Sequence, residues 1–382
     1  MGKRKKPKID EGFRLLAARY MRKQARRLTR QLDGARRAED VECVHQARVA
    51  SRRLRAALGL FRDCTKRKRW KRWRKHVRRV TEGLGAARDK DVQIAFVCGF
   101  LHELDEEAHC PGIARLLVQR EKEREELQGQ VIEAVDRFQA SGVLEEIQAV
   151  TDKVLRKNNG TPACVRTRVA VARTRTAILE HLDSLLVFED CLDEPEDFEQ
   201  HHAMRIAAKR LRYTVEISDP VYDGGLAEHV KAVKQLQTLL GDVHDCDVWV
   251  EDLRAFGRDE RRRIAGRFGD DGPYERLRPG IEHLADDRRA RRRALFEQLV
   301  AYWQQLRADR QWERLVETLQ RDGHPAEHAP EQPPAGEEQV SSDESPAQGA
   351  KPRRRKKLRR RARSLAATGG NGASAAAETV GQ

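Results

Sequence analysis

VHQARVASRRLRA at residues 44–56 and HHAMRIAAKRLRY at residues 201–213 are two versions of one pattern. At an offset of 157 residues they align His45 with His202, Arg48 with Arg205, and Arg52 with Lys209. Two more matched pairs follow in the same order: VTEGLGAARDKDV (80–92) with LQTLLGDVHDCDV (236–248), and PGIARL (111–116) with PGIEHL (279–284). Three matched blocks in one order predict a duplicated multi-helix unit, whose two similar halves pack about a pseudo-twofold axis.

The spacing of apolar residues predicts an all-α protein. Leu, Val, Ile and Ala recur at i, i+3, i+4 and i+7 through almost every segment of the first 320 residues, and alternating strand-like runs are few. Clusters of Gly, Pro, Asn and Asp predict where helices end. They fall at Asp33-Gly34, Pro111-Gly112, Ser141-Gly142, 158–162, Asp219-Pro220, Asp223-Gly224-Gly225 and Gly272-Pro273. The break at 158–162 is the expected midpoint.

The sequence divides into a short extension, a folded region and a tail. Residues 1–7 are a basic N-terminal extension, and residues 8–320 form the predicted helical domain, with halves at 8–157 and 162–320. From 321 to 382 the helical pattern gives way to Pro, Gly, Ser, Ala and Glu, which predicts a disordered tail. A basic block at 351–363 holds ten Lys or Arg in thirteen positions.

The chain is strongly basic. Its 382 residues include 76 Lys and Arg against 61 Asp and Glu, a formal net charge of +15. The tail holds 11 bases and 8 acids, so most of the excess belongs to the predicted helical domain. Because we find neither a signal peptide nor an apolar run that could span a bilayer, we expect no membrane association. Seven widely spaced cysteines without a CxxC pair suit reduced thiols in a cytoplasm.

Each copy of the opening pattern places its basic residues on one face of a helix. At 100° per residue Arg48, Arg52 and Arg55 lie beside His45, and alanines and leucines lie opposite. The second copy does the same with His202, Arg205, Lys209 and Arg212. Residues 44–81 contain fifteen Lys or Arg and one acid, and residues 201–215 contain four bases and no acid. Since like charges four residues apart repel, this pattern favours a polyanion-binding surface over an ordinary solvated face.

The helix predicted from 66 to 80 extends this surface. Trp70, Trp73 and Val77 form its buried stripe, and nearly all its other positions are Lys or Arg. Its Lys75 and Arg78 correspond to Lys231 and Lys234 of the second half. A pseudo-twofold axis that brought these faces together would line one shared cationic channel.

The histidines and the tyrosine have alternative interpretations. Histidine is a common metal ligand, and it also fixes helix packing by bonding a backbone carbonyl. A metal site is disfavoured because His45 and His202 are flanked by arginines, and no HExxH motif or Cys/His cluster is present. Tyr213 is either a groove-lining donor or a core residue.

The second matched block contains paired aspartates. We interpret the glycine of each copy as a helix end, and the aspartates as a cap for the next helix and a partner for an arginine. Paired carboxylates can instead hold Mg²⁺ for phosphate hydrolysis. The residues are Gly85, Asp89 and Asp91 in one copy and Gly241, Asp245 and Asp247 in the other. We find no phosphate-loop, GxSxG, kinase or dinucleotide motif.

The matched blocks together resemble the CHAD family, the conserved-histidine α-helical domain. HxxRxxxRRLR and HxxRxxxKRLRY are each followed about forty residues later by LGxxxDxDV, and the resemblance covers residues 8 to 320 approximately. It implies two helical bundles around a basic pore and non-catalytic binding of inorganic polyphosphate. The ExExK motif of the triphosphate-tunnel domain that some members carry is missing, so no hydrolase or cyclase activity is implied. The corresponding ligand-binding positions are His45, Arg48, Arg52, Arg53, Arg55, Lys75, Arg78, His202, Arg205, Lys209, Arg210, Arg212, Tyr213, Lys231 and Lys234.

We therefore expect a cytoplasmic, non-enzymatic protein that binds inorganic polyphosphate along a cationic channel and associates with polyphosphate granules. We expect neither a cofactor nor a metal, and phosphate or sulfate is expected to occupy the same site. A nucleic-acid-binding or compacting protein is the first alternative, favoured by the 351–363 block. A metal-dependent phosphohydrolase using the histidines and the Asp pairs is the second.

Overall fold

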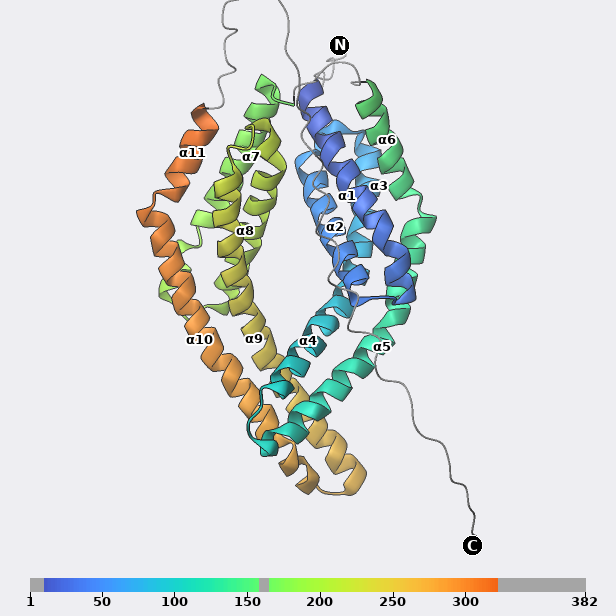
Figure 1. Ribbon diagram of the computed structural model, residues 1–382, viewed down its shortest axis with the longest axis vertical. Coiled ribbons are helices and arrows are strands. Elements are labelled where there is room, and N and C mark those ends of the chain that lie inside the picture. Colours follow the sequence, from blue (N-terminus) through green and yellow to red (C-terminus); the bar gives the residue numbers. More distant parts are fainter. Residues whose placement is uncertain (1–9, 158–164, 322–382) are drawn as a thin grey trace, which may run out of the picture. The chain divides into compact units, whose positions relative to one another are not determined.

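Eleven α-helices and five short 3₁₀ turns make up the described part of the chain (Figure 1). The computed structural model describes residues 10–157 and 165–321, which belong to one compact unit. The all-α prediction is confirmed, since no strand occurs within these ranges. The helices of the first range are α1 (Glu11–Arg37), α2 (Val41–Leu60), α3 (Arg67–Gly83), α4 (Gly85–His102), α5 (Cys110–Ala140) and α6 (Val143–Lys157). Those of the second are α7 (Arg168–Leu186), α8 (Phe198–Ser218), α9 (Ala227–Phe268), α10 (Arg278–Ala308) and α11 (Gln311–Arg321).

Side-chain caps fix where several helices begin. The Asp10 carboxylate accepts a hydrogen bond from the backbone N–H of Phe13 at 2.8 Å, and the Asp40 carboxylate accepts one from Glu42 at 2.8 Å. Asp197 caps α8 in the same way, through the N–H of Gln200. These bonds satisfy N–H groups that have no partner within the helix, and so fix the residues at which α1, α2 and α8 begin.

The helices of each range pack mainly on one another. In the N-terminal half α1 lies against α2 and α6, and α2 lies against α3 (Figure 1). In the C-terminal half α7, α8, α9 and α10 pack in sequence order. The apolar faces predicted for α2 and α8 are buried, including Leu54 and Leu211. The two halves also meet, because α2 contacts α8 and α5 contacts α10.

The far ends of α4, α5, α9 and α10 build a second apolar core, which we call the joint cluster. Val97 and Ile113 of the first half pack there with Trp249, Ile281 and Leu284 of the second. The joint cluster therefore fastens one half to the other at a distance in sequence of more than 130 residues.

Two glycines allow α5 and α10 to approach closely beside the joint cluster. A Cβ added to Gly112 would lie 2.1 Å from the carbonyl oxygen of Leu277, and one added to Gly280 would lie 2.0 Å from that of His109. Both glycines belong to the matched PGIARL and PGIEHL blocks, so the third block marks a helix crossing. The imidazoles of His109 and His283 stack beside it with centroids 4.0 Å apart.

Two of the predicted helix ends are wrong. α1 continues through Gly34 to Arg37, and α9 continues through Gly241 to Phe268. Gly34 serves close packing instead, because a Cβ there would lie 2.5 Å from the Cys43 sulfur. The ends expected at Ser141-Gly142, Asp219-Pro220 and Gly272-Pro273 are confirmed. The expected midpoint at 158–162 and nearly all of the 321–382 tail lie outside the described residues.

Candidate polyanion-binding site

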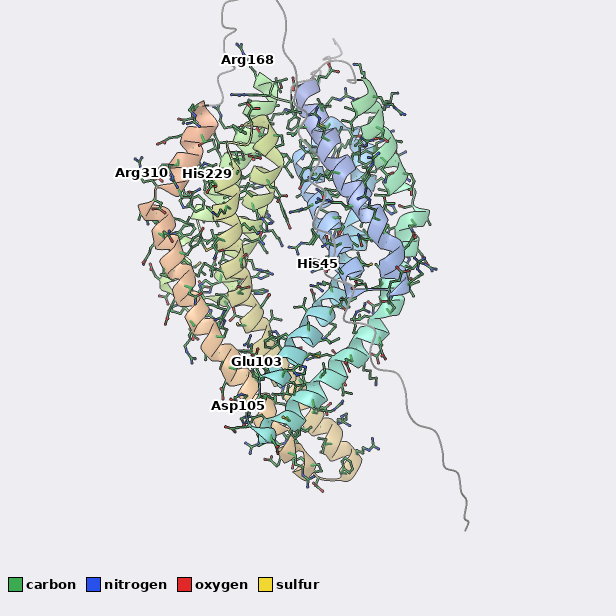
Figure 2. The ribbon with its side chains drawn as sticks, viewed as in Figure 1. His45, Glu103, Asp105, Arg168, His229 and Arg310 are labelled. Atoms are coloured by element: carbon green, nitrogen blue, oxygen red, sulfur yellow. The ribbon has the colours of Figure 1, made fainter. Side chains whose placement is uncertain are left out.

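The basic faces of α2 and α8 lie close to each other at the contact between the halves. An ion pair of 3.1 Å joins Arg53 of α2 to Glu216 of α8 across this contact. Figure 2 marks His45 near the beginning of α2, on the helix that supplies half of the site. Because the apolar faces of both helices are buried in the core, their polar faces are the sides left for a ligand.

Five basic side chains from these two helices form what we call the central cation cluster. Its members are Arg48, Arg52 and Arg55 from α2, and Arg205 and Lys209 from α8. Burial and the positive charges of the four arginines lower the pKa of Lys209 to about 8. The site is therefore half-buried and strongly positive.

The charge of the cluster is poorly compensated by the protein itself. Arg48 lies 3.4 Å from Asp89, and Arg205 lies 3.8 Å from Asp245, but both carboxylates are largely exposed. Within residues 10–157 and 165–321, Arg52, Arg55 and Lys209 form no ion pair. Burial lowers the pKa of Arg48 as well, assisted by Arg52, Arg88 and Arg205. A bound anion would supply the missing negative charge.

The aspartates of the second block do not cap helices. Asp89 and Asp91 lie within α4, and Asp245 and Asp247 lie within α9, so the capping hypothesis is wrong. The predicted pairing with arginine is confirmed. The second aspartate of each copy binds an arginine of the following helix, Asp91 with Arg124 at 2.6 Å and Asp247 with Arg292 at 2.8 Å.

The glycines of this block lie beside the arginines of the first block. A Cβ on Gly85 would lie 2.6 Å from the Arg48 guanidinium, so Gly85 leaves room for that side chain. A Cβ on Gly241 would lie 3.9 Å from the Arg205 guanidinium, which is an ordinary contact. The two matched blocks therefore lie next to each other in both halves, and the approach is closer in the first. The duplication and the channel themselves stay predictions.

Two site residues were missed by the sequence analysis, Arg88 and His244. They occupy the same position in the second matched block, and both lie in electrostatic reach of a cluster arginine. The His244 ring lies 4.4 Å from that of His202 between centroids. Burial, assisted by the positive charge of the nearby Arg205, His202 and Lys209, lowers the pKa of His244 to about 4. The signal was present in the sequence, because this aligned position is basic or ionisable in both copies.

Comparison with known proteins identifies the family. The model of the CHAD domain matches residues 19–254, which is more than half of the chain. The chain belongs to the CHAD domain family. Among solved structures, the CHAD domain from the plant Ricinus communis superposes with a TM-score of 0.52 at 21% identity, covering 75% of this chain and 91% of its own. PptA from Streptomyces chartreusis gives a TM-score of 0.51 at 18% identity, covering 76% and 98%. No curated protein matches this sequence.

The other predicted positions of this CHAD protein surround the cluster or lie apart from it. Arg53 forms an ion pair with Glu216. Arg212 donates a hydrogen bond to the Gln237 side chain at 3.2 Å and lies over the Tyr213 ring. Arg78 pairs with Glu82 at 2.7 Å and lies in electrostatic reach of Arg55. The remaining predicted lysines and arginine are exposed and form no ion pair with a described residue: Lys75, Arg210, Lys231 and Lys234.

The described part of this CHAD chain contains neither a candidate metal site nor a candidate membrane-spanning helix. No group of three or more His, Cys, Asp and Glu side chains gathers there in a way that could hold a metal ion. His201, next to His202, bonds the Cys191 carbonyl through its Nε2 at 2.8 Å, and so has the packing role that was the alternative for His45 and His202. Of the helices within these ranges, none is both long and apolar enough to cross a membrane.

Proposed function

We propose that this protein binds inorganic polyphosphate without hydrolysing it, and that the central cation cluster is the binding site. The observation that carries the proposal is the environment of Lys209, a half-buried ammonium surrounded by four arginines and without an acidic partner. Burying like charges together is unfavourable unless an anion joins them. A polymer with a negative charge on every phosphate fits several such cations at once, with arginines as forked donors and lysine as a point charge.

The burial of the cluster favours a slim anion over a nucleic acid duplex. The side chains of Arg48 and Arg205 are only 24% and 28% exposed, and they lie between helices that contact each other. A duplex presents its phosphates on a wide surface and binds best to exposed cations. A single polyphosphate chain is slim enough to lie along the polar faces of α2 and α8 beside Lys209. A cytoplasmic location and association with polyphosphate granules belong to the same proposal.

A competition experiment on the full chain tests this function. Labelled long-chain polyphosphate is titrated against duplex DNA at several salt concentrations, in one arm with EDTA and in a parallel arm with Mg²⁺. We expect tighter binding of polyphosphate, a steep loss of affinity with salt, and no release of phosphate. Equal or tighter binding of DNA would make nucleic acid the ligand, and metal-dependent phosphate release would make the protein a hydrolase.

Two double variants locate the site. Arg52→Glu with Lys209→Glu reverses two cluster charges that form no ion pair, and we expect at least a tenfold loss of polyphosphate affinity. Arg267→Glu with Arg276→Glu makes the same charge change on exposed residues near the end of α9 and in the turn before α10. If both pairs weaken binding equally, the protein attracts polyanions only through its net charge. Far-UV circular dichroism checks that both variants keep their helices.

A further inference from the structure

α1 carries a second strip of uncompensated positive charge. Residues 12–32 contain seven Lys or Arg and no acid, and six of them lie around one hollow on the helix. This hollow has a volume of about 500 Å³ and also touches Leu15 and Leu155. We call its basic residues the α1 strip: Arg19, Arg22, Lys23, Arg26, Arg27 and Arg30.

The protein neutralises only one member of the α1 strip. Arg22 pairs with Asp152 of α6, and the other five form no ion pair with any residue of the described ranges. Several of them are three or four residues apart, where like charges repel along a helix. The opposite face of α1 is buried, including Leu28 and Ala25. The basic face is therefore the side of the helix left for solvent or for a ligand. α7, the first helix of the other half, mixes its bases with Glu180 and Asp183.

The strip runs along the helix, and Arg27 on one of its flanks lies on the side of the α2–α8 contact. Arg19, Lys23, Arg26 and Arg30 lie within a stretch of twelve residues, which rises about 16 Å along an α-helix. Arg27, on the flank of the hollow, acts electrostatically on the phenol of Tyr20. The same phenol feels Arg53, Glu216 and Tyr213, which lie at the contact of α2 with α8. Tyr20 therefore links Arg27 of the α1 strip to the α2–α8 contact, whose two helices also carry the central cation cluster.

We propose that the α1 strip is a second subsite for the same polymer, so that one long polyphosphate chain occupies the central cation cluster and continues along α1. The inference rests on the proposed function and adds a preference for chain length. A chain that fills both subsites gains from their linkage, because binding at the first raises its effective concentration at the second. A chain too short to span them fills only the central cation cluster.

Binding of a short chain of about five phosphates and a long chain of about one hundred tests the proposal. In the unaltered protein we expect the long chain to bind at least tenfold more tightly per molecule at equal phosphate concentration. Lys23→Glu with Arg26→Glu should remove at least tenfold of affinity for the long chain and change that for the short chain less than threefold. Arg267→Glu with Arg276→Glu is the control of equal charge, and it should lower both affinities by one small factor.

The outcomes separate this inference from the proposed function. If the Lys23 and Arg26 variant behaves like the control with both chains, α1 is no subsite. In that case, loss of short-chain binding in the Arg52 and Lys209 variant would still support the central cation cluster as the binding site. If that central variant keeps its short-chain affinity, the proposed function fails first. If the α1 variant weakens duplex DNA binding alone, the strip serves nucleic acid and the proposal is overturned. Lys23→Gln with Arg26→Gln repeats the test with milder changes should the charge reversals unfold the chain.

Discussion

Replacing Gly112 with alanine should push apart the two helices that join the halves. The added Cβ would lie 2.1 Å from the carbonyl oxygen of Leu277 and 3.1 Å from the backbone nitrogen of Ile281. Since carbon and oxygen approach no closer than about 3.3 Å in ordinary contacts, α5 and α10 would have to separate by about 1 Å. Both obstructing groups are backbone atoms within α10 or at its start, so no side chain can rotate away.

The cost of that separation follows from the joint cluster. Overpacking a tight contact costs about 1–3 kcal/mol, and here it also loosens Ile113 against Trp249 and Ile281. The better helix propensity of alanine returns at most about 1 kcal/mol. We expect Gly112→Ala to lower the free energy of unfolding by about 2 kcal/mol, measured by urea denaturation followed by far-UV circular dichroism.

Gly129 offers a control on the same helix. It is exposed in α5 and a Cβ there would meet nothing within 4 Å. Gly129→Ala should therefore raise the free energy of unfolding by about 0.5–1 kcal/mol through propensity alone. A Gly112→Ala protein as stable as the unaltered chain would refute the close crossing, and so would equal losses in both variants.

Three further predictions concern charge. The pKa of Lys209 is lowered to about 8, and a bound polyanion favours its charged form. Binding therefore takes up a proton above pH 8, and polyphosphate affinity should fall between pH 7 and pH 10. In binding titrations, Lys209→Met should flatten this pH profile. Asp91→Asn leaves buried Arg124 without its partner and should lower the free energy of unfolding by about 3 kcal/mol in urea denaturation. Asp89→Asn, at an exposed position, should lower it by less than about 1 kcal/mol. The second variant should also bind polyphosphate more tightly, because it removes a competing carboxylate. Saturating polyphosphate should raise the melting temperature of the protein by mass action, with EDTA making no difference; a melting temperature that responds only when Mg²⁺ is added would contradict a metal-free site.

The sequence predicts the helices and the basic faces well, because both depend on local spacing. His45, Arg48 and Arg205 could be placed on helix faces from a period of 3.6 residues alone. Which charges are neutralised could not be predicted in the same way: Glu216 lies 163 residues from Arg53, and only the packing of α2 on α8 brings them together.

Glycine accounts for the errors in the predicted helix ends. The residue breaks helices and also permits close approach, and the sequence does not distinguish these uses. Gly34 lies inside a continuing helix and lets the Cys43 side chain come near, whereas a Cβ on Gly241, also inside its helix, would make only an ordinary contact. The α1 strip has no matching copy in the second half, so the repeated blocks of the sequence give no sign of it.

Residues of both halves build the joint cluster, so neither half alone contains all the residues of this core. A chain divided between residues 157 and 165 would give two fragments, one exposing Val97 and Ile113 and the other exposing Trp249 and Leu284. Each fragment alone should aggregate or bind chaperones, and the two produced together should reassemble without a covalent link. On the proposed function, polyphosphate would then bridge two separate polypeptides at the α2–α8 contact, so the polymer should strengthen the reassembled complex.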